Sequence, residues 1–259
     1  MEALLNRAII YMREFMDKHD NSGHGSSHCE QVLRNAQMAL CEFTLSENDR
    51  LAVQLAALLH DVDDSKLFST TNYTNARRIL KNLSVDIFLG DFISNDNDND
   101  DIDNDNNDNS ITSDIIDDNL VIEMIDLVSC SKNGNSLIEP RWKLIPRDAD
   151  RIEALGVIGI KRCYQYNNAR NVPLFVSTTP LLTSVEEIEK ALDPTRLEKY
   201  IACGGKSDSM IDHYYDKLLH IGTLHSGSIY LQNLAQERRL IMMQFLAALS
   251  ASFKYLQES

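Results

Sequence analysis

The segment Leu51–Leu59, with the sequence LAVQLAALL, contains eight apolar residues and one glutamine. Alanine and leucine favour helices, and a helix that is apolar on almost every side has to be buried among other elements. His60 and Asp61 follow this segment directly, so two side chains that bind metals stand where a buried helix ends. A buried carboxylate is costly unless it is paired or bound to a metal. The sequence therefore predicts a core helix that ends in a pair of metal ligands.

The remaining chain also shows the periodicity of helices, and an amphipathic helix is expected over 3–19. Ser26 or Ser27 can cap a second helix, and Ser46 can cap the helix that carries the apolar segment. Further helices are expected over 74–83, 118–127, 148–166, 185–191, 208–221 and 226–256. Ten glycines, five prolines and the lack of an alternating strand pattern favour helices over a turn-rich β fold. We therefore expect an all-α fold with a single domain over 1–259.

One acidic segment dominates the charge of the chain. The net charge is −14, and half of it comes from the seven aspartates of residues 95–109. Such a segment cannot bury apolar surface, so we expect a disordered Asn/Asp-rich insertion over 93–117 within the domain. Runs of this composition arise in AT-rich genomes, which suggests a protist or a large DNA virus as the source.

The composition also restricts the classes of partner that the chain is expected to bind. An acidic chain is a poor candidate for binding a nucleic-acid polymer, because that binding uses lysine and arginine. No apolar segment approaches 18 residues, so no membrane span is expected, and the N-terminus lacks a signal-peptide pattern. The five cysteines are odd in number and scattered, which is typical of reduced thiols in a cytoplasmic protein.

Histidines and aspartates recur along the chain in the order H…HD…D. The candidate ligands are His28, His60, Asp61 and Asp148, each expected near the end of a helix. Imidazoles and carboxylates suit manganese, iron, cobalt, nickel or zinc, and four such ligands leave positions open for water and a substrate oxygen. The pattern therefore indicates a divalent-metal hydrolase. Two alternatives stay open at this point: a surface histidine pair formed by His24 and His28, and a simple helix-capping role for Asp148.

Five segments of the chain carry a family resemblance. They are Gly23–Val32 (GHGSSHCEQV), Leu58–Lys66 (LLHDVDDSK), Val128–Lys132 (VSCSK), 147–160 (RDADRIEALGVIGI) and 212–219 (DHYYDKLL). With these segments the chain resembles the HD-domain metal-dependent phosphohydrolase superfamily. More narrowly, it is similar to the bacterial-type HD hydrolases that include nucleotide pyrophosphatases. The resemblance covers about residues 20–240, interrupted by the acidic insertion.

The resemblance implies a role for each matching residue. His28, His60, Asp61 and Asp148 would bind one divalent metal, with Mn²⁺ expected and Mg²⁺, Co²⁺, Ni²⁺ or Fe²⁺ as alternatives. Asp61 would also contact the attacking water, and Asp64 would act as a general acid or base. The residues that would contact the substrate are His24, Lys66, Arg151, His213 and Lys217.

The function implied is hydrolysis of a small phosphorylated substrate, most simply a nucleotide. Release of pyrophosphate from a nucleoside triphosphate is favoured, and phosphomonoester hydrolysis comes second. Gly25 and Ser26 depart from the acidic and aromatic residues that commonly follow the first histidine in the family. This departure favours the alternative of a catalytically silent nucleotide sensor, and a helical interaction module without a metal is a third possibility. The apolar C-terminal helix suggests a homodimer.

Overall fold

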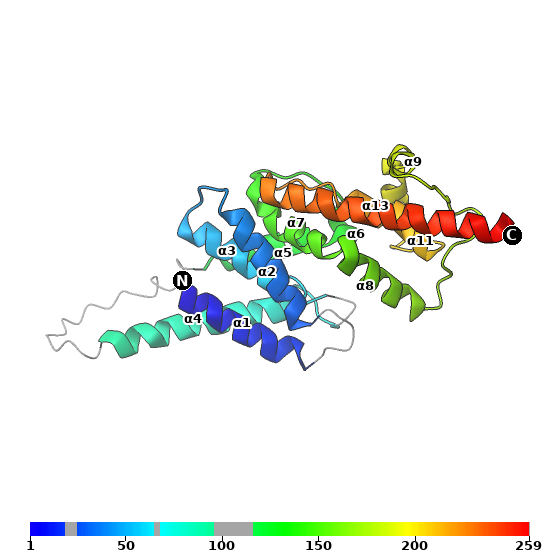
Figure 1. The fold of residues 1–259 in the computed structure, drawn as a ribbon. Helices are drawn as coiled ribbons and strands as arrows, with labels where there is room; N and C mark the ends of the chain where they lie inside the picture. The colour runs from blue at the N-terminus through cyan, green and yellow to red at the C-terminus, as the bar shows by residue number, and fades with distance from the viewer. Residues whose placement is uncertain (19–24, 65–67, 96–115, 259) are drawn as a thin grey trace. The chain divides into compact units, whose positions relative to one another are not determined.

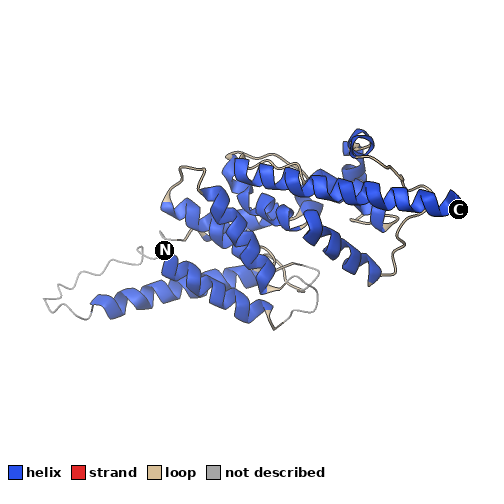
Figure 2. Ribbon diagram, in the orientation of Figure 1, coloured by secondary structure: helices blue, strands red, loops and turns tan. Residues whose placement is uncertain are grey.

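The computed structural model describes residues 1–18, 25–64, 68–95 and 116–258. These residues form helices and connecting loops, and none of them forms a strand (Figure 2). The prediction of an all-α fold is therefore confirmed. Most of the expected insertion over 93–117 lies outside the described residues, as do His24 and Lys66. No helix in the described part of the chain is long and apolar enough to cross a membrane.

The chain divides into two compact units, and each is described by itself. The first comprises Met1–Gln37 and Phe43–Asp126, and the second comprises Met38–Glu42 and Leu127–Ser259. The expectation of a single domain over 1–259 stays a prediction. All five cysteines are free thiols, and burial raises the pKa of Cys163 to about 11, so this thiol stays protonated at neutral pH.

In its described residues, the first unit is built from five helices, α1 to α5 (Figure 1). Their bounds are α1 Glu2–Met16, α2 Ser26–Leu40, α3 Glu47–Leu59, α4 Thr74–Asn95 and α5 Asp118–Val128. Helix α1 packs against both α3 and α4. The apolar segment predicted to be a core helix is α3, and of its residues 51–59 only Gln54 is not buried. Its start is also as predicted, because the Ser46 hydroxyl accepts a hydrogen bond from the Asp49 amide at 3.1 Å.

The second unit contains the short helices α6 to α12 and the long helix α13 (Figure 1). The bounds are α6 Cys130–Asn133, η1 Arg141–Leu144, α7 Ile145–Glu153, α8 Gly156–Asn168, α9 Val185–Lys190, α10 Pro194–Ala202, α11 Met210–His213, η2 Tyr214–Leu218, α12 Leu219–Ile221 and α13 Ile229–Glu258. Helix α13 packs against α7, α8 and α9. Glu42 caps its first turn by accepting hydrogen bonds from the Ser228 hydroxyl at 2.6 Å and the Tyr230 amide at 2.8 Å.

The prediction of a single helix over 148–166 is wrong, because two helices occupy this range. Helix α7 ends at Glu153, and α8 starts at Gly156, whose φ of +69° is a left-handed conformation that favours glycine. A Cβ atom on Gly159 would lie 2.1 Å from the Ala154 carbonyl oxygen, so only glycine permits this tight reversal. Both glycines were visible in the sequence, but the apolar periodicity continues through the break and hides it.

Candidate metal site

The first unit brings together three of the four predicted metal ligands. His28 is the third residue of α2, His60 follows the last residue of α3, and Asp61 comes next in the chain. Each is at least nine-tenths buried. The apolar α3 carries its C-terminal end into the core, so the HD pair has to be buried with it. Histidine and aspartate side chains in such surroundings require strong polar partners.

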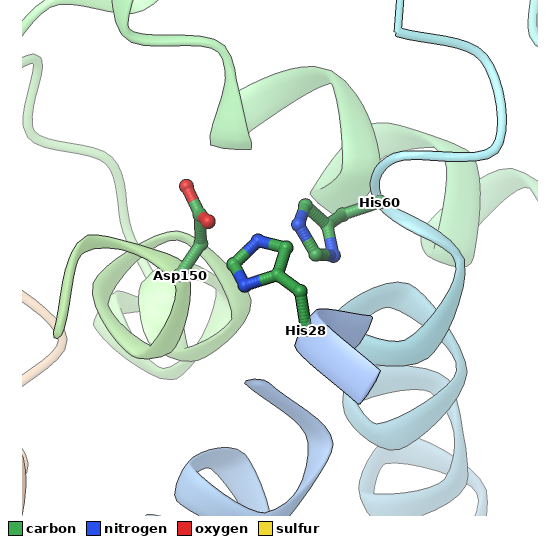
Figure 3. Close-up of side chains that lie close together, drawn as sticks. All are labelled: His28, His60 and Asp150. Atoms are coloured by element: carbon green, nitrogen blue, oxygen red, sulfur yellow. The ribbon is translucent and has the colours of Figure 1, made fainter. Parts of the chain in front are cut away.

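Both imidazoles approach the same carboxylate oxygen. The Nε2 atom of His28 lies 3.6 Å from Asp61 Oδ2, and the Nε2 atom of His60 lies 3.4 Å from that oxygen. The centroids of the two rings are 5.2 Å apart with an interplanar angle of 74°, and Figure 3 shows the two rings next to each other. Three atoms that can bind a metal therefore converge, one from the start of α2 and two from the residues that follow α3.

The donor atoms fit a divalent metal. The Nδ1 atom of His60 lies 2.9 Å from the Ala57 carbonyl oxygen, which can only accept, so Nδ1 carries the proton and Nε2 presents a lone pair. Two atoms that bind one metal at about 2.0–2.2 Å lie about 3.0–3.6 Å apart in ordinary coordination geometries. The separations to Asp61 Oδ2 lie within this range. A backbone contact that fixes the histidine tautomer is also typical of metal-binding histidines.

Asp63 fixes the turn that carries the HD pair. Its Oδ1 atom accepts a hydrogen bond from the Asn75 amide at 3.0 Å, and its Oδ2 atom accepts one from the Ala76 amide at 2.8 Å. The Asn75 side chain donates in return to the Val62 carbonyl oxygen at 2.8 Å. These groups join the residues after His60 to the first turn of α4. Sequence reasoning missed Asp63, because its capping partners lie twelve or more residues away in the chain.

We expect Asp63→Ala to lower the free energy of unfolding by about 1–2 kcal/mol, the usual effect of removing a helix cap. Because the HD turn also loses its anchor, metal affinity should fall about 10- to 100-fold, as for other supporting groups at metal sites. Urea denaturation and metal titration measure the two effects. The matched control is Asp117→Ala, which removes the acceptor of the Leu120 amide at the start of α5. Equal metal affinity in the two variants would show that Asp63 is only a cap.

The second unit presents two carboxylates on α7. Asp148, the fourth predicted ligand, is fully buried, and its Oδ2 atom accepts hydrogen bonds from the amides of His225 at 2.8 Å and Ser226 at 2.6 Å. Asp150 is only half-buried and is the third side chain drawn in Figure 3. Two imidazoles and a carboxylate, as in His28, His60 and Asp150, can bind a divalent metal. Sequence reasoning did not select Asp150 as a ligand, although the same Asp-Ala-Asp motif contains it.

A buried arginine, Arg147, lies beside Asp148. The Nε atom of Arg147 lies 3.6 Å from Asp148 Oδ1. Burial lowers the pKa of Arg147, and the charge of Arg151 lowers it further. Burial also lowers the pKa of His225, against the influence of Asp148. The buried charged residues of α7 are thus two arginines, Arg147 and Arg151, and two carboxylates, Asp148 and Glu153.

The predicted substrate residues lie in several places. His24 and Lys66 fall outside the described residues. Arg151 is on α7, where its guanidinium donates to the Gly134 carbonyl oxygen and, at 2.8 Å, to Asn135 Oδ1. Asp64 stands three residues after Asp61, and its amide donates to the Asp61 carbonyl oxygen at 3.1 Å. Its predicted acid or base role stays a prediction.

His213 and Lys217 belong to a segment with an unusual backbone. His213 ends α11, and Lys217 lies in η2, which is a π-helix. Short π-helical turns occur often at functional sites. Burial lowers the pKa of His213 to about 3, and Lys217 lowers it further, so the imidazole is neutral at pH 7. Any contact of His213 with a phosphate would thus be a hydrogen bond and not an ion pair.

The low pKa of His213 predicts acid sensitivity. The unfolded chain binds a proton near the usual pKa of 6.5, whereas the folded chain binds it only near 3. Stability is therefore retained above about pH 6.5 and lost as the pH falls toward 3, by an amount on the order of 1–3 kcal/mol. Urea denaturation at pH 7, 5 and 4 should show a smaller acid loss for His213→Gln than for the wild type. Identical pH dependence would contradict this assignment.

Comparison with known proteins shows which fold the chain has. No family model matches the chain. An uncharacterized protein of Acanthamoeba polyphaga mimivirus is 39% identical over 246 residues, which cover 93% of this chain and 94% of that protein. A solved HD-superfamily hydrolase from Bacillus thuringiensis has a TM-score of 0.59 at 20% identity, with 98% of each chain covered. A Lactobacillus plantarum protein has a TM-score of 0.62 at 23% identity, covering 98% of this chain and 99% of its own. The chain therefore belongs to the family of the mimivirus protein, and its fold is that of an HD-superfamily hydrolase.

Proposed function

We propose that the protein is a metal-dependent phosphohydrolase that acts on a small phosphorylated substrate. The observation that carries this proposal is the convergence of the His28 and His60 Nε2 atoms on Asp61 Oδ2, at 3.6 and 3.4 Å. Without a metal, this cluster would hold two imidazoles and a carboxylate in the core of the first unit. A divalent metal explains why all three are there, and the HD-superfamily fold supports the same chemistry.

The ligand set would be completed by a carboxylate of α7, either Asp148 or Asp150. Mixed imidazole and carboxylate ligands suit Mn²⁺, Co²⁺, Ni²⁺ and Fe²⁺ better than Mg²⁺, and Mn²⁺ is the proposed metal. In hydrolases of this kind a divalent metal polarises a phosphoryl oxygen and lowers the pKa of water. The metal would thus supply the electrophile, while the protein orients the substrate and transfers protons.

The side chains around the metal would carry out the remaining steps. Asp61 would orient the attacking water, and Asp64 would exchange protons with it or with the leaving group. Arg151 and Lys217, together with His24 and Lys66, would stabilise the charge that develops on the phosphoryl oxygens. His213 would contribute a neutral hydrogen bond.

A nucleoside triphosphate is the proposed substrate, with pyrophosphate as the product, and phosphomonoester hydrolysis is the second candidate. The resemblance to nucleotide pyrophosphatases supports the first. A polymer of nucleic acid is not proposed, because the chain has a net charge of −14.

The test is the metal content of the untagged protein, combined with phosphate and pyrophosphate release from a panel of nucleotides with added Mn²⁺. About one metal per chain with release from one class of nucleotide would establish the enzyme and identify its product. Metal without turnover across the panel would favour a nucleotide sensor on the same fold. Absence of metal after incubation with each candidate ion would refute the ligand assignment.

A further inference from the structure

A network of ion pairs and hydrogen bonds fixes how α10 lies against α11 and η2. The Nη2 atom of Arg196 in α10 lies 3.1 Å from Asp212 Oδ1 and 2.7 Å from Asp216 Oδ1. The other oxygen of Asp212 accepts hydrogen bonds from the hydroxyls of Thr179, at 2.7 Å, and Ser209, at 2.6 Å. Because Asp212, Thr179 and Ser209 are all buried, water competes little for these bonds. The position of α10 along η2 is therefore determined by several specific polar contacts.

Tyr200 is the next side chain on the same side of α10. It follows Arg196 by four residues, which is about one helical turn. The rings of Tyr200 and His213 have centroids 5.4 Å apart and an interplanar angle of 61°. The Nζ atom of Lys217 lies over the Tyr200 ring, 5.9 Å from its centroid. One aromatic ring thus lies against both of the predicted substrate residues in the segment formed by α11 and η2.

The chemistry of the three side chains suits these contacts. The face of an aromatic ring is electron-rich and attracts an ammonium group, and two rings favour an edge-to-face arrangement. Tyr200 is buried, and burial raises the pKa of its phenol, so the side chain is uncharged at pH 7. His213 is neutral at the same pH, because burial lowers its pKa to about 3. The ammonium of Lys217 therefore meets an electron-rich ring without repulsion from a charged imidazole.

A ring contact of this kind reduces the freedom of a lysine before a ligand binds. The flexible four-carbon stem of lysine has many conformations, and fixing it on binding costs entropy. An ammonium that already lies over Tyr200 has lost part of that freedom in the folded protein. Lys217 is consequently better prepared to contact an anion than a lysine on an open surface.

We propose that Tyr200 is a positioning residue that holds His213 and Lys217 in the orientation in which they contact a phosphoryl group. The phosphoryl contact rests on the proposed function, whereas the orientation of the two side chains by Tyr200 does not. Tyr200 acts through these neighbours and not on the substrate. Both contacts are made by the aromatic ring, so the ring is required and the hydroxyl is not.

Brief labelling of the full-length protein with limiting acetic anhydride, followed by mass spectrometry, measures how firmly Lys217 is held. Tyr200→Leu should raise labelling of Lys217 about 3- to 10-fold relative to the exposed Lys161, because the ammonium loses the ring that stabilises its charge. Tyr200→Phe keeps the ring and should be labelled as the wild type is. Leu197→Ala removes another buried side chain of α10, so it is the matched control for loosened packing and should leave the labelling unchanged.

Equal labelling of Lys217 in the wild type and in Tyr200→Leu would overturn the proposal. An equal increase in Leu197→Ala would also overturn it, because Tyr200 would then only fill space. If Tyr200→Leu fails to fold, the wild type still decides. The ring current of Tyr200 should shift the ε-proton NMR signals of Lys217 upfield, and signals at their usual position would refute the contact.

Kinetics with the preferred nucleotide connect the orientation of Lys217 to the reaction. We expect kcat/KM to fall about 10-fold in Tyr200→Leu and about 2-fold or less in Tyr200→Phe, with unchanged metal content in both. Increased labelling of Lys217 in Tyr200→Leu together with an unchanged kcat/KM would contradict a role in the reaction. Increased labelling in a protein without any turnover would support the positioning by Tyr200 and contradict only the proposed function.

Discussion

His60→Ala and Asp61→Ala are expected to lose the bound metal and to lower kcat/KM by about 10³-fold or more, since a metal contributes several kcal/mol to the transition state. His60→Ala removes one of the two imidazoles that approach Asp61 Oδ2, and Asp61→Ala removes that oxygen itself. Metal analysis of the purified variants and initial rates on the preferred nucleotide measure both effects. Retained turnover in either variant would refute the mechanism.

Two further variants separate metal binding from folding. His60→Gln keeps a polar side chain of similar size but cannot reproduce both imidazole nitrogens, so it should also lose metal. Asp208→Asn changes an exposed aspartate of the second unit and should leave metal content and rate unchanged. Circular dichroism of all four proteins would show whether lost activity accompanies lost structure.

Asp148→Ala and Asp150→Ala are expected to differ strongly in stability. Asp148 is fully buried, accepts two backbone amides, and faces Arg147, so its removal leaves a buried guanidinium without its neighbouring carboxylate. The expected loss is about 3–5 kcal/mol. Asp150 is half-buried, and changes at such positions usually alter stability by about 1 kcal/mol or less. Urea denaturation of the two variants, with chelator present, measures the difference.

The same pair identifies the carboxylate that completes the metal site. Metal content, measured at urea concentrations below the denaturation midpoint, should fall in the variant that has lost a metal ligand. Loss of metal in Asp150→Ala with normal stability would assign the ligand to Asp150. Retained metal in Asp150→Ala, together with loss in a folded Asp148→Asn, would assign it to Asp148. Equal stability of Asp148→Ala and Asp150→Ala would contradict the environment described for Asp148.

Sequence reasoning predicted the features that depend on short-range patterns. The apolar α3, the Ser46 cap and the start of α2 at Ser26 follow from periodicity and capping chemistry within a few residues. Helix α10 was missed, because no helix was expected between 191 and 208, whereas Pro194 begins a helix there and Asp193 caps it. The sequence identified His28, His60 and Asp61 as candidate ligands. Their approach to one oxygen depends on tertiary packing and could not be predicted from spacing.

The contacts of Asp63 and Glu42 show the same limit of sequence-based prediction. Each carboxylate caps a helix that begins far away in the chain, α4 in one case and α13 in the other. Capping rules consider residues next to a helix, so they cannot find a cap supplied by a distant segment. A polar residue without a partner nearby in the sequence can therefore have a tertiary contact that only the folded structure reveals.

The short segment Met38–Glu42 has a consequence for how this architecture can be inherited. Although it lies between α2 and α3 in the chain, it belongs to the second unit, where Glu42 contacts the start of α13. The second unit is thus discontinuous, and a gene segment that encodes only residues from Leu127 onward omits part of it. Domains that are exchanged between genes are usually single continuous segments. The two units are therefore expected to be gained, lost and duplicated together, as one evolutionary module.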